Sequence, residues 1–186
     1  ETEIFIYGTT RATNAIVTGN TAKTAFLTTK GFPDLLVLKE GGKQKAHDFS
    51  VKYPRPYIPK KNTFEIDERI NSEGGISKPL DIKKTRDLIK KLKQDKFEAI
   101  AVSLVWSIMN PCHEIEVGKI IKEIAPQIPF SLGHDLIPVL REYRRASTTC
   151  IDSSLKPLMQ KHFIELRDKL QQNHFSGQLF ISTSAG

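Results

Sequence analysis

The chain has 186 residues, of which 39% are apolar and 26% charged, a composition typical of one soluble globular domain or slightly more. No run of about 18 apolar residues is present, so the sequence predicts no transmembrane helix. Its two cysteines, Cys112 and Cys150, match neither a disulfide framework nor a zinc motif. We therefore expect a cytoplasmic protein with reduced thiols and no metal site of its own.

The formal net charge of +7 is concentrated between residues 39 and 61, where seven basic residues stand against two acidic ones. Such an excess suits a polyanionic partner such as nucleic acid. The basic residues are interleaved with three prolines, however, and not with stacking aromatics on predicted strands. We therefore interpret the stretch as a solvated surface loop and do not favour nucleic acid as a partner.

The N-terminal elements are predicted to be a strand at residues 4–7, a Gly-Thr-Thr turn, and a helix at residues 11–18 capped by a threonine. Unpaired N–H groups point out of a helix N-terminus, so such a turn can bind an anion, although most such turns only cap a helix. The candidate residues for binding a substrate or phosphate are Thr9, Thr10 and Asn14.

The middle of the chain alternates strands and helices, which predicts an α/β fold with a mainly parallel sheet. The segment 99–106 is apolar on both faces apart from Ser103, as in the centre of a covered parallel sheet. Strands are predicted at 24–29, 63–71, 76–78, 99–106 and 129–132, and helices at 34–39, from Asp81 to about Asp95, and from Asn110 to Pro126.

The longest periodic segment follows. Apolar residues spaced three and four apart from Leu140 to Leu170 predict one long helix, which Pro157 should kink, and a last strand at 178–182. The first turns of the helix are rich in side chains that can bind an anion. Arg141 could present its guanidinium group to a carboxylate or phosphate, or Arg141 and Glu142 could form ordinary ion pairs.

His134 stands beside an aspartate in the turn that is predicted before this helix. A histidine there can act as a proton shuttle or as a hydrogen-bonded turn residue. The sequence gives the other four histidines, at 47, 113, 162 and 174, no suggestive company. The candidate catalytic residues are therefore His134, Arg141 and Glu142.

Four motifs in order resemble the hydantoinase A / 5-oxoprolinase family. The resemblance runs the whole chain and departs from the family at Tyr7, where a histidine is usual, so a role for that histidine does not carry over. The motifs are Tyr-Gly-Thr-Thr-Arg-Ala-Thr-Asn-Ala-Ile at 7–16, Thr-Thr-Lys-Gly-Phe-Pro-Asp at 28–34, Asn-Pro-Cys-His-Glu at 110–114 and Arg-Glu-Tyr-Arg-Arg-Ala-Ser-Thr-Thr at 141–149.

The resemblance implies a mainly parallel sheet flanked by helices, part of an actin-like (ribonuclease H-like) ATPase fold, with one long helix near the C-terminus. It implies an enzyme that uses ATP and Mg to phosphorylate the carbonyl of a cyclic amide before the ring is opened. The alternative in the same family is the ATP-handling subunit of an acetone or acetophenone carboxylase. Implied partners are a small-molecule substrate and a B-type hydantoinase subunit or domain, with residues 39–61 as a candidate assembly surface and an oligomeric full-length protein.

The same resemblance divides the chain into a hydantoinase/oxoprolinase N-terminal region at 1–177, truncated at its start, and the first strand of the hydantoinase A catalytic domain at 178–186. Both ATP-phosphate loops of the family would then lie outside the chain. We therefore expect a fragment that alone neither binds ATP tightly nor turns over. Micromolar binding of Mg-ATP in a calorimeter would contradict this expectation.

Overall fold

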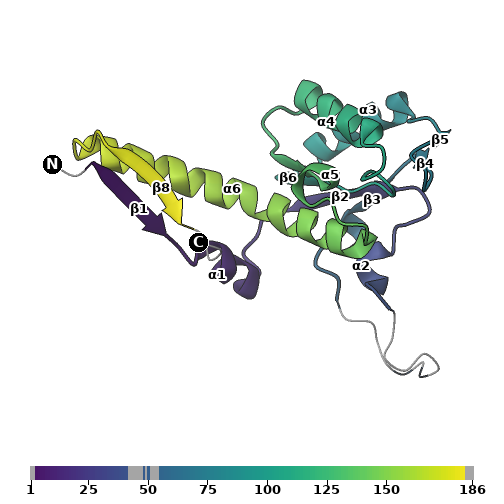
Figure 1. Cartoon of the computed structure of the whole chain (residues 1–186), viewed down its shortest axis with the longest axis horizontal. Helices are drawn as coiled ribbons and strands as arrows, with labels where there is room; N and C mark the ends of the chain where they lie inside the picture. Colours follow the sequence, from purple (N-terminus) through teal and green to yellow (C-terminus); the bar gives the residue numbers. More distant parts are fainter. Residues whose placement is uncertain (1–2, 42–47, 49, 51–54, 183–186) are drawn as a thin grey trace. The chain divides into compact units, whose positions relative to one another are not determined.

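The computed structural model describes residues 3–41, 48, 50 and 55–182, which form two compact units (Figure 1). The larger unit is Lys23–Ser154. The smaller unit consists of the described residues of Glu1–Ala22 and Leu155–Gly186. Helix α6 (Glu142–Gln172) begins in the larger unit and ends in the smaller one.

The larger unit is built on a four-stranded sheet in which all neighbours are parallel, with the order β3-β2-β6-β7. The chain runs from β2 outward to β3 and then returns to the other side of β2 at β6. The strand order therefore reverses between β2 and β6, which makes this the topological switch point. The strands are β2 (Thr24–Thr29), β3 (Thr63–Ile66), β6 (Ala99–Val102) and β7 (Phe130–Leu132).

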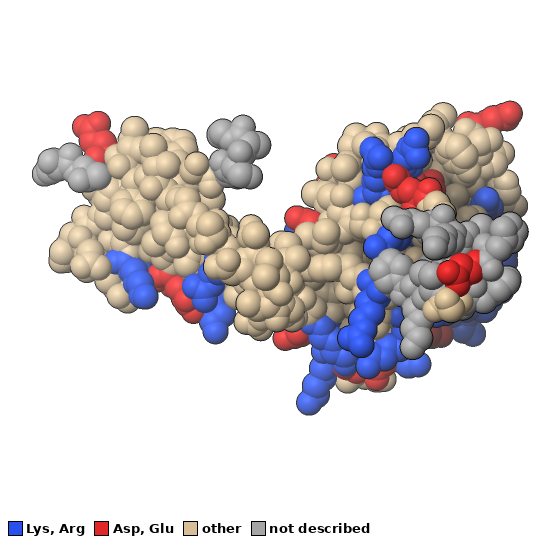
Figure 2. All heavy atoms as spheres, turned by 90° about the horizontal axis from the view of Figure 1, so that it is seen from below, with Lys and Arg blue, Asp and Glu red and all other residues tan. Residues whose placement is uncertain are grey.

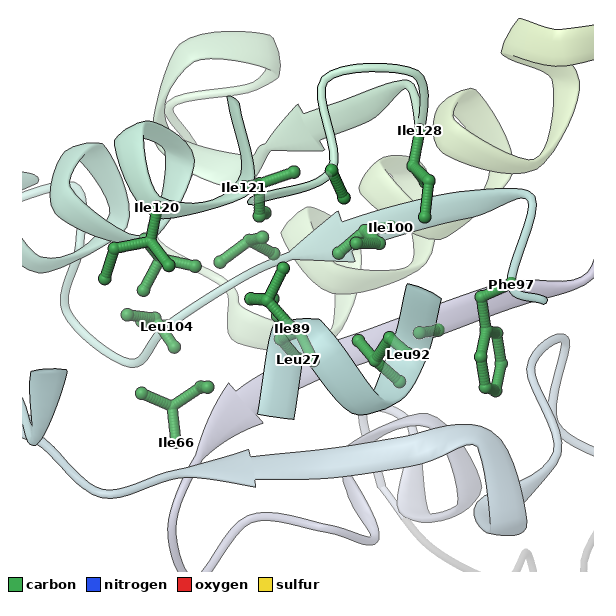
Figure 3. Close-up of a cluster of buried hydrophobic side chains, with 14 residues drawn as sticks. Leu27, Ile66, Ile89, Leu92, Phe97, Ile100, Leu104, Ile120, Ile121 and Ile128 are labelled. Atoms are coloured by element: carbon green, nitrogen blue, oxygen red, sulfur yellow. The ribbon is translucent and has the colours of Figure 1, made fainter. Parts of the chain in front are cut away.

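Helices cover both faces of this sheet because its central strands are apolar on both sides. Leu27 and Ile100 pack with α3 (Ile82–Gln94) and α4 (Cys112–Ile124), and Figure 3 shows this cluster. Phe26 and Ala101 point the other way and pack with α2 (Leu35–Leu38) and the first turns of α6. Each large apolar side chain buried in this way contributes about 1.5–3 kcal/mol.

Local signals fix the ends of several elements. The Asp81 carboxylate accepts a hydrogen bond from the Lys84 amide at 3.0 Å and caps α3, as predicted. The amide of Cys112 donates to Asn110 Oδ1 at 3.1 Å at the start of α4.

In the sequence, a hairpin of β4 (Arg69–Ile70) and β5 (Ile76–Lys78) lies between β3 and α3. Its turn uses Gly74 at φ 83°. Two single turns complete the unit, the 3-10 helix η1 (Lys60–Asn62) and α5 (Gly133–Leu136).

The smaller unit contains a two-stranded parallel sheet of β1 (Ile4–Gly8) and β8 (Gln178–Ser182). Ile4 pairs with Gln178 and Gly8 with Ser182, so the carboxyl ends of both strands lie at the same edge. Helix α1 (Arg11–Thr18) follows β1 and ends at Gly19, which has the left-handed φ of 69°. Phe175, in the loop that follows α6, packs edge-on against Phe5 with ring centroids 6.0 Å apart.

The expected α/β class, with a mainly parallel sheet flanked by helices and one long C-terminal helix, is confirmed. The strand predicted at 63–71 is interrupted at residues 67–68, so that β3 ends at Ile66 and Arg69–Ile70 form the separate strand β4. The Glu68 amide donates to the Ile66 carbonyl at 3.0 Å, and this tight turn takes the chain out of the sheet. The strand predicted at 99–106 stops at Val102. A turn follows in which the Ser107 amide donates to the Leu104 carbonyl at 3.3 Å and Trp106 has a φ of 61°.

Smaller differences concern the long helix. It begins at Glu142, so the predicted first apolar position, Leu140, precedes it and is 64% exposed. Pro157 lies inside α6, and the kink there stays a prediction. No helix in the described part of the chain is long and apolar enough to cross a membrane.

Candidate functional site

Buried polar side chains gather where the four parallel strands of the larger unit end, a region that we call the carboxyl edge. β2 ends at Thr29, β6 is followed by the turn 104–107, and β7 continues into α5. In doubly wound sheets, ligands bind outside the carboxyl ends of the strands at the switch point. The carboxyl edge is therefore the candidate functional site of this unit.

Glu114, in the first turn of α4, is the central acidic residue of the carboxyl edge, and its side chain is fully buried. One oxygen, Oε1, accepts the backbone N–H of Leu104 at 2.7 Å. The other, Oε2, accepts the backbone N–H of His134 at 3.0 Å and the ring Nδ1 of His134 at 2.6 Å. Three donors from the ends of β6 and β7 thus compensate the carboxylate for its lost hydration.

These contacts fix the chemistry of His134. Since Nδ1 donates to a carboxylate, the neutral ring carries its free lone pair on Nε2, which can accept a proton. The His134 side chain is 17% exposed, and no other described residue hydrogen-bonds Nε2. An imidazole oriented by a buried carboxylate is the arrangement that serves general bases. The proton-shuttle role of His134 stays a prediction, with Glu114 as the orienting partner.

His113, the neighbour of Glu114 in the sequence, forms a second pair. Its Nδ1 lies 2.7 Å from Glu68 Oε2, and both side chains are buried. Glu68 also accepts the hydroxyl of Thr29, whose oxygen accepts the Val105 amide at 2.9 Å. In the sequence His113 has no suggestive company, and its partner Glu68 lies 45 positions away. Because this pair is enclosed, we assign it to holding β2, the turn after β3 and α4 together.

The turn after β6 is held by three successive amides. The N–H groups of Leu104, Val105 and Trp106 donate to Glu114, Thr29 and Glu142 respectively, the last at 3.2 Å. These acceptors come from α4, β2 and α6. These three hydrogen bonds hold the turn, including the left-handed backbone at Trp106, in place at the switch point.

Arg145 links the start of α6 to the turn after β6. Its side chain is fully buried, donates to the carbonyl of Val139 at 2.7 Å and to that of Leu104 at 3.3 Å, and pairs with Glu142. Glu142 is thus engaged by the turn and by Arg145 and is 24% exposed. Its contacts are those of a positioning residue, and the predicted catalytic role of Glu142 stays a prediction.

Arg141 differs from its neighbours because it is exposed and has no side-chain hydrogen bond or ion pair with any described residue. Its carbonyl accepts the amide of Arg145 at 3.1 Å. Arg144 makes a surface ion pair with Glu40 at 2.7 Å, the ordinary alternative considered for this segment. Among the arginines at the start of α6, Arg141 is the one whose guanidinium group is open to an anion.

The other predicted binding residues belong to the smaller unit. Thr10 caps α1 through its backbone but makes no side-chain cap, and Asn14 is exposed. The Thr9 hydroxyl oxygen accepts the Arg11 amide at 3.1 Å. The six predicted site residues thus divide between the two units, and their roles stay predictions.

Sequence reasoning missed the buried residues of the carboxyl edge. A signal existed for Glu68, because it occupies the inward position of the alternation that includes Ile66 and Ile70. No comparable signal existed for Arg145 or for the contact of Glu114 with His134, since these depend on which elements pack together.

A basic cavity lies at the opposite, amino end of the sheet. It has a volume of about 590 Å³, and Lys23, Lys61 and Lys91 line it around two phenylalanines. The Lys23 ammonium lies 4.5 Å from the ring centre of Phe97 and donates to the Asp95 carbonyl at 2.6 Å. The cavity therefore shares no residue with the carboxyl edge.

Eleven of the 23 residues of the basic stretch 39–61 lie outside the described residues. In its described part, Lys60 pairs with Asp34 at 2.6 Å and Glu40 pairs with Arg144. Figure 2 shows basic and acidic side chains side by side on this face of the larger unit. No group of three or more His, Cys, Asp and Glu side chains in the described part is arranged to hold a metal ion.

The fold and this edge define a doubly wound α/β domain with a partly open polar site at its switch point. The chain belongs to the hydantoinase/oxoprolinase family, because the model of the hydantoinase/oxoprolinase N-terminal region matches residues 1–125. This match leaves the domain boundary expected at residue 177 a prediction.

Two relatives show the range of the family. The chain is 33% identical over 170 residues to the caprolactamase alpha subunit of Pseudomonas jessenii, covering 90% of this chain and 24% of that protein. It is 29% identical over 197 residues to the acetophenone carboxylase gamma subunit of Aromatoleum aromaticum, covering 99% and 27%. The crystal structure of ATP-dependent caprolactamase from P. jessenii superposes with a TM-score of 0.82 at 31% identity, covering 96% of this chain and 26% of that one. The chain thus spans about a quarter of the length of these relatives.

Proposed function

We propose that the full-length protein is an ATP-dependent hydrolase of the hydantoinase / 5-oxoprolinase type, which activates a cyclic amide by phosphorylating its carbonyl before the ring opens. The observation that carries this proposal is the similarity to ATP-dependent caprolactamase, with a TM-score of 0.82 over 96% of the chain. In this reading the described residues supply part of the substrate site, and the rest of the protein supplies the remainder.

The carboxyl edge offers a group for the hydrolytic step. In the proposal, His134 Nε2 removes a proton from the water that attacks the activated carbonyl carbon, while Glu114 keeps the ring in the required tautomer. The open guanidinium group of Arg141 attracts an anionic group of the substrate, and Glu142 keeps the turn at Trp106 in place. Thr9, Thr10 and Asn14 are proposed to contact the substrate or its phosphate.

ATP and Mg belong to the proposal for the whole protein. The described residues do not by themselves fit this group, because the buried carboxylates Glu68 and Glu114 are already saturated by neighbouring donors. The remaining acidic side chains there form no metal-binding group of three. We therefore derive no step through ATP from this chain.

A carboxylase is the second candidate function. The similarity to the acetophenone carboxylase gamma subunit extends over 99% of the chain, which supports a role as the ATP-handling subunit of an acetone- or acetophenone-type carboxylase. Both relatives are named as subunits, which supports an oligomer with a B-type partner subunit or domain. Co-purification with and without residues 39–61 tests whether that stretch is the assembly surface.

The test of function is an assay of the full-length protein for ATP hydrolysis with hydantoin, 5-oxoproline, caprolactam, and acetone plus bicarbonate. We expect a cyclic amide to stimulate ATP hydrolysis and to yield a ring-opened product. Stimulation by a ketone plus bicarbonate alone would establish the carboxylase alternative. No stimulation by any of these compounds would overturn both proposals.

Variants then test the residues of the carboxyl edge. His134→Ala should lower kcat by roughly 100-fold or more, the usual contribution of a general base. Arg141→Ala should lower activity without unfolding the protein, whereas Arg144→Ala, which removes only a surface ion pair, serves as the matched control. Unchanged activity in Arg141→Ala would mean that the basic start of α6 is structural.

A further inference from the structure

Three side chains of the smaller unit that the proposed function does not use meet next to the Gly-Thr-Thr turn. The Tyr7 hydroxyl lies 2.9 Å from His162 Nε2, and an Arg11 guanidinium nitrogen lies 3.3 Å from His162 Nδ1. The Tyr7 and His162 rings are also in contact, with centroids 5.5 Å apart. The residues come from β1, α1 and α6, and Tyr7 and His162 are separated by 155 positions.

The direction of each hydrogen bond in this cluster follows from the donor inventory. Arginine can only donate, so His162 Nδ1 must accept and carries no proton. A neutral imidazole then carries its proton on Nε2, which must donate to the Tyr7 oxygen. The hydroxyl hydrogen of Tyr7 is therefore not used in this bond, and no other described residue accepts it. The bond from His162 therefore orients the Tyr7 hydroxyl group and leaves its hydrogen free to be donated to another acceptor.

The free donors lie at the carboxyl end of β1. Tyr7 is the penultimate residue of that strand, and Arg11 opens the helix that follows the turn. Thr9 accepts from the Arg11 amide, so its own hydroxyl hydrogen is also available. None of the hydrogen bonds of these three residues within the described part goes to a carboxylate. The cluster thus combines hydroxyl donors and one cation without a negative charge to neutralise them.

We propose that Tyr7, Arg11 and Thr9 form a binding site for a phosphoryl oxyanion, in which Tyr7 donates its hydroxyl hydrogen to a phosphate oxygen and His162 is the positioning residue. A phosphoryl group has several acceptor oxygens and a full negative charge, which match two hydroxyl donors and a guanidinium group. The inference rests on the proposed function in one respect, since that function supplies a phosphorylated substrate carbonyl as the natural occupant.

The test is a titration of the 186-residue chain with inorganic phosphate, in which the ¹H–¹⁵N NMR signals of the histidine rings are recorded at each phosphate concentration. We expect His162 to be protonated on Nε2 and not on Nδ1, and its signals to shift saturably with phosphate. Tyr7→Phe keeps the ring and removes only the hydroxyl, and it should weaken phosphate binding about tenfold, because hydrogen bonds to charged groups are among the stronger ones. Tyr57→Phe is the matched control, since Tyr57 is also hydrogen-bonded through its hydroxyl, to Ser154 at 2.7 Å, but lies in the larger unit.

Two substitutions of His162 separate positioning from packing. In His162→Gln the amide can still accept from Arg11 and donate to Tyr7, so phosphate affinity should be largely retained. In His162→Leu both bonds are lost, and affinity should fall as in Tyr7→Phe. Equal affinity in the parent, Tyr7→Phe and His162→Leu, with unchanged backbone spectra, would overturn the proposal, as would the absence of a saturable shift in the parent. Because the titration needs no ATP hydrolysis, it decides this site even if the assay of the full-length protein fails.

Discussion

The two units of the chain differ in how far their parallel sheets are buried. In the larger unit all six residues of β2 are buried, and helices lie on both faces of the sheet. In the smaller unit the parallel sheet has two strands, and Ile6 and Phe180 on one face are 70% and 50% exposed. Parallel strands are normally covered on both faces, as in the larger unit, whereas one face of β1 and β8 is open among the described residues.

This difference extends to the polar groups at the strand ends. At the carboxyl edge of the larger unit, Glu68, Glu114 and Arg145 are enclosed and paired, whereas His134 and Glu142 are partly exposed. In the smaller unit the donors of Tyr7 and Thr9 are not enclosed by such a network. The larger unit therefore presents a pre-organised site, whereas the smaller unit presents free donors.

Hydrogen exchange of the whole chain should show the largest contrast between the units. Amides of β2 and β6 open only with the whole core, whereas β1 and β8 belong to a sheet with two edge strands. We expect protection factors in β1 and β8 to be lower by about 100-fold or more. Comparable protection in the two sheets, measured by mass spectrometry or NMR, would contradict the comparison.

Two adjacent arginines separate the enclosed network from the surface. Arg145→Ala removes the buried partner of Glu142 and the donors to two carbonyls, and it should lower the free energy of unfolding by about 3–5 kcal/mol. Arg144→Ala breaks an exposed pair with Glu40 and should cost about 0–1 kcal/mol. Denaturant titrations measure both values. Similar losses in the two variants would mean that the buried network does not stabilise the larger unit.

Glycine substitutions compare the packing of the two strand ends. A Cβ at Gly133 would lie 3.0 Å from Ser103 Oγ and 3.1 Å from Arg145 Cγ, so Gly133→Ala should destabilise the chain by about 1–3 kcal/mol. A Cβ at Gly8, at the end of β1, would meet nothing within 4 Å, and Gly8→Ala should cost less than about 0.5 kcal/mol. Thermal unfolding of both variants distinguishes a packed edge from an open one.

The smallest effect concerns a surface charge cluster of the larger unit. The Lys78 ammonium group, with Lys84, lowers the pKa of Asp67, and the Lys84 backbone and side chain lower the pKa of Asp81. Because the folded pKa values are depressed, this stabilisation is complete above the ordinary carboxyl pKa of about 4 and is lost as the pH falls below it.

Denaturant midpoints at pH 7 and pH 3 should therefore differ less in Asp67→Asn than in the parent. The control is Asp135→Asn, because the Asp135 carboxylate is exposed and forms no ion pair in the described part. This variant should keep the pH dependence of the parent. High salt should reduce the effect of Asp67, since exposed charges are screened. An unchanged pH dependence in Asp67→Asn would show that the cluster does not stabilise the fold.

Local sequence patterns predicted most of the elements because their causes are local. The strands 24–29 and 178–182 and the helix 11–18 have the predicted ends, and Asp81 caps its helix as expected. The errors at 67–68 and 103–106 arose where the chain leaves the sheet. There the conformation is set by hydrogen bonds to distant side chains, such as that of Val105 to Thr29, 76 positions away.

The sequence by itself determined the α/β class, the family resemblance and the identity of His134, Arg141, Glu142, Thr9, Thr10 and Asn14 as candidates. These follow from periodicity, turn chemistry and motif order, which are properties of short segments. Three contacts could be found only in the folded structure: those of Glu114 with His134, of Glu68 with His113 and of His162 with Tyr7. A buried or shared proton needs a specific partner, and packing alone brings together partners that lie 20, 45 and 155 positions apart.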